Sequence, residues 1–296
     1  MSRNWSKVLA VFLIALVVGL IGPARWRVVV SEDSKSPETL VNVDLQLVLA
    51  VDVSASIDNQ EGRLQRDGYV KALLDPLVLH AIKAGPHGRI AVAYTEWSGP
   101  LYQSVVVDWR IIDSPGSANA FAALLDVAPM QGGRRTSISG AIQHAVAMFH
   151  KSRFNATRKV IDISGDGPNN AGFYVHRTRY RAFGNGITIN GLPIHNDRPS
   201  PLGIPATPNI DLYYEDCVIG GPGAFIVVAE TLRSFAGAVR RKMILEIAGL
   251  QPPPADRRRA SGTGRVMPTQ LNLGLTDCTI GEKQYELFRK RQNRKN

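Results

Sequence analysis

The amino-acid sequence predicts an α/β fold in which helices cover both faces of a mostly parallel central sheet with one antiparallel edge strand. Short apolar runs of the kind that form buried strands recur along the chain, as at residues 44–51 and 159–163. Segments with helical spacing of apolar residues separate these runs, and this alternation favours parallel strand pairing. An apolar fraction of 44% over 296 residues is enough for one large domain or two small ones.

The predicted elements follow in chain order from the strand at 44–51. The segment 60–82 has helical spacing but contains Pro76, so we expect a kink or a break there. A strand at 89–97 turns through a Gly-Pro pair into a second strand at 102–109, which predicts a hairpin. The elements expected after the hairpin are helices at 119–125 and 137–149, a strand at 159–163, a helix at 174–183, a strand at 187–194, a loop at 197–209, a short helix at 211–217, a strand at 224–229 and a helix at 231–247.

Residues 1–24 have the pattern of a targeting signal. Arg3 and Lys7 precede an apolar run of 14 residues, 8–21, and small residues follow it. About 20 apolar residues are needed to span a bilayer comfortably, so this length favours a cleaved signal peptide over an uncleaved membrane anchor. Both alternatives predict export, to the periplasm or outside the cell. A polar, Ser-rich linker is expected at 25–43, before a domain at 44–250.

The C-terminal residues 251–296 are predicted to form a basic tail that opens with three prolines. Of the net charge of +10, a surplus of six comes from residues 252–296, which hold ten Lys and Arg against four Asp and Glu. Such a tail is either solvated or binds an anionic lipid surface, nucleic acid or an acidic partner. Contact with a membrane surface is thus a candidate for this tail and for the N-terminal segment. No specific nucleic-acid binding is predicted, because the basic helix at 174–183 lacks an interleaved aromatic platform.

The two cysteines, Cys217 and Cys278, are a candidate disulfide. An even pair in an exported chain can be oxidised, and this pair would attach the tail to the main domain. The alternative is two unpaired thiols, because spacing in the sequence does not establish proximity.

Three polar segments stand where strands end or helices begin. Asp52, Ser54 and Ser56 follow the first strand, Thr136 precedes the helix at 137–149, and Asp166 follows the strand at 159–163. Ligands of open α/β sheets bind in the loops beyond the carboxyl ends of the strands, so we expect these side chains to converge on one divalent cation. Ligands that are all oxygen favour Mg²⁺, Mn²⁺ or Ca²⁺ over Zn²⁺. Taken singly, each segment is equally consistent with a helix cap or a turn.

The order Asp-x-Ser-x-Ser, then Thr, then Asp resembles the metal ion-dependent adhesion site of the von Willebrand factor A domain. The resemblance covers residues 44–250 and implies a Rossmann-like fold. Residues 216–225 are similar to those of a bacterial subfamily of exported proteins of unknown function. By this resemblance the site residues are Asp52, Ser54, Ser56, Thr136 and Asp166. The three hydroxyls would touch the ion directly or through water. One departure is Gly165, where many relatives have Thr before the aspartate.

The residue pattern favours binding over catalysis. Three hydroxyls and one or two carboxylates leave an open coordination position, which an exposed Asp or Glu of a protein partner can fill. Arg134, Arg135 and Asn169 are candidate contacts for that partner. A phosphatase of the haloacid dehalogenase type would need a second aspartate where Ser54 stands, and no nucleophile motif occurs, so we expect no enzyme. The alternatives are a hydrolase that uses the same cation to activate water, and an envelope protein that binds surfaces through its basic tail.

Overall fold

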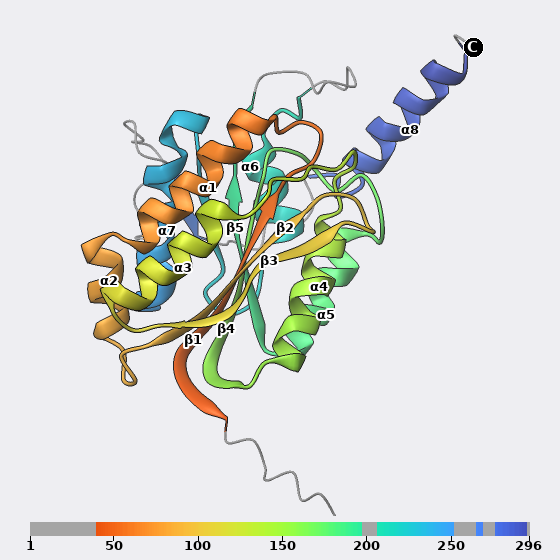
Figure 1. Ribbon diagram of the computed structural model, residues 1–296. Coiled ribbons are helices and arrows are strands. Elements are labelled where there is room, and N and C mark those ends of the chain that lie inside the picture. Colours follow the sequence, from red (N-terminus) through yellow and green to blue (C-terminus); the bar gives the residue numbers. More distant parts are fainter. Residues whose placement is uncertain (1–39, 197–205, 252–264, 269–275, 295–296) are drawn as a thin grey trace, which may run out of the picture. The chain divides into compact units, whose positions relative to one another are not determined.

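The computed structural model describes residues 40–196, 206–251, 265–268 and 276–294 (Figure 1). All of them belong to one compact unit, Thr39–Asn296. The signal or anchor segment 1–24, the linker as far as residue 39 and most of the loop at 197–209 lie outside the described residues. Within the described ranges, every helix is too short or too polar to cross a membrane.

The described strands form one seven-stranded sheet in the order β3-β2-β1-β4-β5-β6-β7. β1, β2, β4, β5 and β6 pair in parallel, while β3 and β7 pair antiparallel at the two edges. The predicted fold class is confirmed, but a second antiparallel edge strand comes from the segment predicted to be a tail. The strands are β1 Val41–Asp52, β2 Ile90–Trp97, β3 Gln103–Ile112, β4 Phe154–Gly165, β5 Ile187–Pro193, β6 Phe225–Val228 and β7 Arg265–Pro268.

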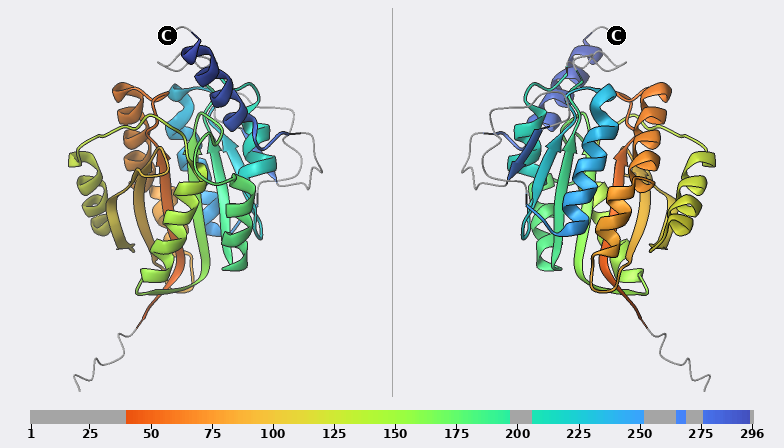
Figure 2. Two further views of the ribbon diagram at one scale, coloured as in Figure 1. Left: turned by 90° about the vertical axis from the view of Figure 1, so that its right-hand side faces the viewer. Right: turned by 90° about the vertical axis from the view of Figure 1, so that its left-hand side faces the viewer.

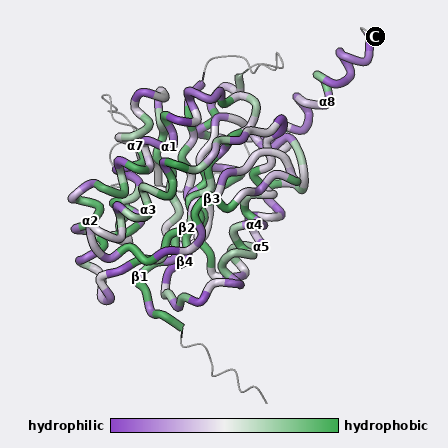
Figure 3. The backbone as a smooth tube through the Cα atoms, viewed as in Figure 1, coloured by the Kyte–Doolittle hydropathy of each residue, from purple (hydrophilic) through white to green (hydrophobic). Residues whose placement is uncertain are grey.

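Helices cover both faces of the sheet, as the side views in Figure 2 show. One apolar core contains the inward residues of α1, α2, α3 and α7, and the other contains those of α4, α5 and α6. The hydrophobic colour in Figure 3 follows the strands, whereas α8 is mostly hydrophilic. The helices are α1 Asn59–Leu73, α2 Pro76–Lys83, α3 Pro115–Val127, α4 Ile138–Lys151, α5 Val175–Gly184, α6 Ile210–Tyr213 with a π-helical continuation Tyr214–Val218, α7 Phe235–Ala248 after a 3₁₀ turn Leu232–Ser234, and α8 Ile280–Asn293.

The break predicted at Pro76 separates α1 from α2. The side chain of Asp75 accepts a hydrogen bond from the backbone N–H of Leu77, and Pro76 occupies the first turn, where its missing N–H costs nothing. α1 itself begins after Asp58, whose side chain accepts from the backbone of Gln60 and Glu61. Both helices therefore have an aspartate as N-cap, and the N-cap of α2 fixes where α1 ends.

A buried ion cluster lies between α7 and the sheet. The Lys242 ammonium is 2.6 Å from a carboxylate oxygen of Asp162 on β4 and also contacts Glu246 one helical turn further on. Lys242 and Asp162 are fully buried, and Asn190 on β5 donates a hydrogen bond of 2.9 Å to Glu246. Burial raises the pKa of the Glu246 carboxyl to about 7, and the Lys242 charge opposes this shift. The cluster therefore links α7 to two neighbouring strands.

Candidate functional site

Asp52 closes β1 and points into the protein rather than into solvent. It is fully buried, and its Oδ1 accepts a hydrogen bond of 2.7 Å from the backbone N–H of Ser54. Its second oxygen, Oδ2, is buried without any hydrogen bond among the described residues. A buried carboxylate oxygen without a partner is costly, so this oxygen is available to coordinate a cation.

The structure brings the five residues of the predicted metal site together. Ser56 Oγ donates a hydrogen bond of 2.6 Å to Asp166 Oδ1, and the hydroxyls of Ser54 and Ser56 are 3.3 Å apart. Thr136 Oγ1 donates to Ser54 Oγ at 3.4 Å. Asp52 lies in the same loop, linked through the backbone of Ser54. Two carboxylates and three hydroxyls from three loops therefore share one site.

Sheet topology explains why these loops meet. β1 and β4 are parallel neighbours, and Val51 pairs with Ser164, so Asp52 and Asp166 leave the sheet at the same edge. The loop that carries Thr136 is tied to the end of β2, because the backbone N–H of Ser137 donates a 2.6 Å hydrogen bond to the carbonyl of Ser98. All three loops are thus held by strands that lie side by side in the sheet.

The electrostatics of the site favour a bound cation. Burial raises the pKa of Asp52 well above its usual value, and the nearby charge of Asp166 raises it further. The pKa of Asp166 is also raised by burial, although hydrogen bonds from Ser56 and Asn196 oppose the shift. In the described part of the chain, neither carboxylate forms an ion pair. A divalent cation would neutralise both groups, and hard cations prefer oxygen ligands of this kind.

The donor set fits a cation held largely by hydroxyl oxygens. Within the described ranges, no group of three or more His, Cys, Asp and Glu side chains could hold a metal by itself. The two carboxylates need the hydroxyls of Ser54, Ser56 and Thr136 to complete a coordination shell. Such a set suits Mg²⁺, Mn²⁺ or Ca²⁺ better than Zn²⁺, because Zn²⁺ prefers nitrogen and sulfur ligands.

Tyr214 belongs to the site although nothing in the sequence marked it. Its side chain is fully buried, and its hydroxyl makes no hydrogen bond among the described residues. A Cβ atom added to Gly165 would lie 2.8 Å from this hydroxyl and 2.9 Å from Asp52 Oδ2. A side chain at position 165 would therefore collide with Tyr214, from the π-helical turn after α6, and with Asp52. Burial, followed by the charges of Asp52 and Asp166, raises the pKa of Tyr214 well above its usual value.

The three candidate partner contacts have different environments. Arg134 is exposed beside Thr136 and remains a candidate. The Arg135 guanidinium is half-buried, donates to Asn170, and lies 3.3 Å from the ring centroid of Tyr285 on α8. Asn169 is fully buried and its side chain is hydrogen-bonded within the protein, so it is not at the surface where a partner would bind.

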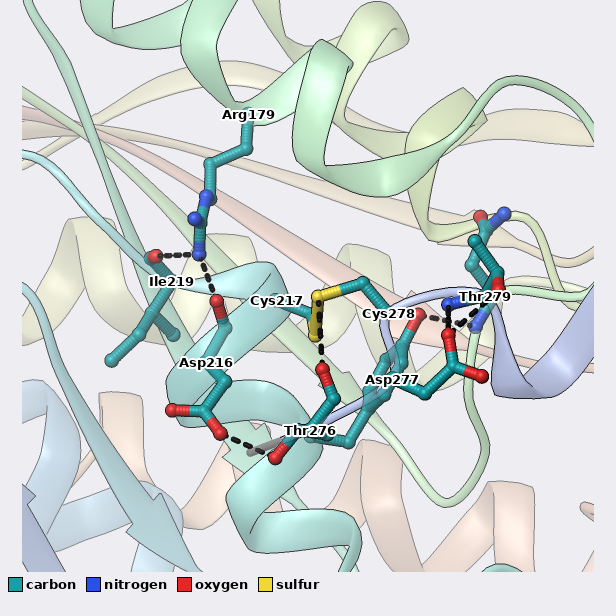
Figure 4. The surroundings of a disulfide bond; sticks show 10 residues. Arg179, Asp216, Cys217, Ile219, Thr276, Asp277, Cys278 and Thr279 are labelled. Carbon is teal, nitrogen blue, oxygen red and sulfur yellow. Dashed lines mark hydrogen bonds between the residues drawn. A yellow bond between two sulfur atoms is a disulfide. The ribbon is translucent and has the colours of Figure 1, made fainter. Parts of the chain in front are cut away.

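Cys217 and Cys278 are joined by a disulfide, with their Cα atoms 5.4 Å apart (Figure 4). Cys217 lies in the π-helical turn after α6, and Cys278 lies just before α8. The Thr276 hydroxyl donates to the Asp216 carboxylate beside the disulfide, and Arg179 donates to the Asp216 carbonyl at 2.6 Å. The described part of the predicted tail is therefore attached to the domain both covalently and by hydrogen bonds.

Solved structures share this fold at low sequence identity. Proximal thread matrix protein 1 from the mussel byssus gives a TM-score of 0.51 at 11% identity, over 71% of this chain and 49% of that one. The pilus adhesin SpaC from Lactobacillus rhamnosus GG gives 0.50 at 14%, over 69% and 30%. A von Willebrand factor type A protein from Catenulispora acidiphila gives 0.49 at 13%, over 69% and 43%. The chain spans about half the length of these proteins or less.

The sheet order, the helices on both faces and the polar loops at one sheet edge give the chain the Rossmann-like fold that the resemblance to the von Willebrand factor A domain implied. A family model described as "Protein of unknown function (DUF1194)" matches residues 42–251. The chain belongs to this DUF1194 family. A search of curated protein sequences finds no match to it.

Proposed function

We propose that this protein is an exported module that binds a divalent cation and, through it, an acidic side chain of a partner protein. The observation that supports this most strongly is the pair of buried carboxylates, Asp52 and Asp166, which form no ion pair with any described residue and lie beside the hydroxyls of Ser54, Ser56 and Thr136. A cation of two charges would offset both carboxylates and use the unbonded Asp52 Oδ2. Mg²⁺ is the first candidate, with Mn²⁺ and Ca²⁺ as alternatives.

The cation would be held by Asp52, Ser54, Ser56, Thr136 and Asp166, and it would supply a Lewis-acidic position for a carboxylate of the partner. The protein residues would fix where that position lies, because strand pairing, the backbone N–H of Ser54 and the side chain of Asn170 hold the loops. Arg134 is exposed beside Thr136 and can attract an acidic partner to this surface.

Binding is a better interpretation than hydrolysis for this arrangement. A hydrolase that activates water with the same cation would need a general base within hydrogen-bonding reach of that water. His195 is adjacent in the chain to Asn196, which donates a hydrogen bond to Asp166, but the His195 ring lies 3.6 Å from Asp211 and 3.3 Å from Glu230. The name of SpaC, a pilus adhesin with the same fold, is consistent with a protein-binding role.

Export is part of the proposal. The Cys217–Cys278 disulfide is of the kind that persists in oxidising compartments, and residues 1–24 have the pattern of a signal or anchor. Intact mass of the exported protein would distinguish a cleaved signal from an uncleaved anchor.

Two measurements test the proposed function. The EDTA-treated protein is titrated calorimetrically with Mg²⁺ and Mn²⁺, and it is used to capture partners from envelope extract with and without EDTA. Asp52→Ala should abolish cation binding and the EDTA-sensitive partners. The matched control is Asp126→Ala, because Asp126 is an exposed aspartate on α3. If wild type, Asp52→Ala and EDTA-treated protein capture the same partners, the proposal is wrong.

A further inference from the structure

The first turn of α8 packs against the loop that follows Asp166. Gly281 lies so close to this loop that an added Cβ would be 2.2 Å from the Asn169 carbonyl oxygen. The next residue, Glu282, accepts a hydrogen bond of 2.8 Å from Asn169 Nδ2. Gly281 is buried, whereas Leu287 near the middle of the helix is 58% exposed. The helix thus contacts the domain at its start and runs away from it afterwards (Figure 1).

Asn169 joins α8 to three other parts of the domain. Its Oδ1 accepts a 3.0 Å hydrogen bond from the backbone N–H of Ser139 at the start of α4. Its Nδ2 also donates to the Phe173 carbonyl at 3.1 Å, and its backbone N–H donates to the Tyr213 hydroxyl at 3.2 Å. A fully buried amide with this many partners adopts a single position, so the loop beyond Asp166 is fixed by it.

Asn170 connects this loop to Thr136, a residue of the candidate metal site. The backbone N–H of Thr136 donates to Asn170 Oδ1 at 3.0 Å, and the backbone N–H of Asn170 donates to the Thr136 carbonyl at 2.8 Å. Arg135 strengthens the link, because it donates to Asn170 and lies against the ring of Tyr285. A continuous series of contacts therefore connects α8 to Thr136, and it ends one hydrogen bond from Ser54.

The disulfide holds this helix in place. Cys278 lies two residues before α8 and is bonded to Cys217, which is fully buried in the π-helical turn that also contributes Tyr214. Since a helix of 14 residues with a mostly exposed surface is marginal in water on its own, its start needs an attachment. The disulfide supplies that attachment beside Asn169 and Tyr214.

We propose that the disulfide-tethered start of α8, through Glu282 and Asn169, is a positioning device for the cation site. Glu282 and Asn169 are positioning residues: they hold the loop after Asp166 and, through Asn170, the backbone of Thr136. This inference rests on the proposed function, because it assumes that Thr136 and Asp166 hold a cation. Breaking the tether or the Glu282 contact loosens the site and lowers its affinity for the cation.

The test compares Glu282→Ala, Glu282→Gln and the double variant Cys217→Ser, Cys278→Ser in the full chain. Arg291→Ala is the matched control, because Arg291 lies on the exposed last turn of the same helix. The first readout is Mn²⁺ affinity by calorimetry. The second is hydrogen exchange of the backbone amides of Ser139 and Asn170 in EDTA, which needs no bound metal.

We expect Glu282→Ala and the double cysteine variant to lose up to about tenfold in Mn²⁺ affinity, which is the lower end of the effect of removing an outer-shell partner, because Glu282 acts on Thr136 only through Asn169 and Asn170. Exchange at Ser139 and Asn170 should accelerate in both variants, while amides of β1 keep their protection. Glu282→Gln should retain wild-type behaviour, because its amide oxygen still accepts from Asn169. Arg291→Ala should be unchanged in both readouts.

Unchanged affinity in Glu282→Ala overturns the inference, and so does acceleration that extends equally to β1, because that is general destabilisation. Failure of the proposed function looks different: the wild type would then bind no Mn²⁺, or Asp52→Ala would bind it equally well. In that case exchange at Ser139 and Asn170 still reports whether α8 positions the loop.

Discussion

Replacing Lys242 with methionine should destabilise the domain strongly, because this lysine is the cation of a buried cluster. Methionine keeps the length of the apolar stem but removes the ammonium group. Asp162 would lose a contact of 2.6 Å, and Glu246 would lose its partner one turn along α7. Both carboxylates would remain in a site that excludes solvent, since Lys242 itself is fully buried.

The expected loss is about 3–5 kcal/mol in the free energy of unfolding, the usual effect of removing one partner from a buried ion pair. That is at least about a fifth of the roughly 5–15 kcal/mol by which domains are typically stable. The loss is limited because Glu246 can take up a proton: its pKa is raised from 4.5 to about 7 by burial even with Lys242 present. The double variant with Glu246→Gln should recover part of the loss, because only one buried carboxylate remains and the glutamine oxygen still accepts from Asn190.

Urea unfolding at several pH values measures these effects through the midpoint, with the slope checked for constancy. A protonated Glu246 in the folded state contributes stability that is fully present below about pH 4.5 and is lost as the pH rises through about 7. The free energy of unfolding of the wild type should therefore decrease as the pH rises through this window, and the Glu246→Gln variant should not show this decrease. A loss below about 1 kcal/mol for Lys242→Met, or a double variant no more stable than the single one, would refute this account of the cluster.

Three further predictions concern the candidate metal site. Gly165→Ala should cost about 1–3 kcal/mol of stability and weaken cation binding, because its Cβ would lie 2.8 Å from the Tyr214 hydroxyl. Adding Tyr214→Phe should recover part of the stability, measured by thermal unfolding, and part of the cation affinity, measured by calorimetry. Cation affinity should fall as the pH is lowered from neutral, because protons compete for Asp52 and Asp166, whose pKa values are raised; a pH-independent affinity would contradict this. Ser54→Ala should lower cation affinity by at least about tenfold with little change in unfolding midpoint, and an unaltered titration would exclude Ser54 as a ligand.

Local patterns in the sequence predicted most elements but placed several of their ends wrongly. β4 begins at Phe154, not at 159, because its first residues alternate between buried and exposed positions and lack a continuous apolar run. β1 begins at Val41, so the predicted linker ends earlier than residue 43. The helix expected at 119–125 begins at Pro115, after the N-cap Ser114. The break at Pro76 was predictable because proline acts through its own backbone.

The described part of the C-terminal segment was interpreted wrongly as a tail. Its helix, α8, is rich in Lys and Arg and has only one buried residue, Gly281, so no apolar stripe marks it in the sequence. Its strand, β7, has four residues and is recognisable only because it pairs with β6. Basic charge predicts solvent exposure, which most of α8 has, but it does not exclude a folded start.

The sequence by itself determined the order of strands and helices from β1 to α7, the parallel sheet, and the edge at which Asp52, Thr136 and Asp166 meet. These follow from local rules: apolar periodicity selects the element, and the carboxyl ends of parallel strands lie together. Only the tertiary structure decided that Tyr214 fills the space beside Gly165 and that Asn169 turns inward to Glu282. Those contacts join residues far apart in the chain, and their geometry depends on how the helices pack on the sheet, for which no local pattern exists.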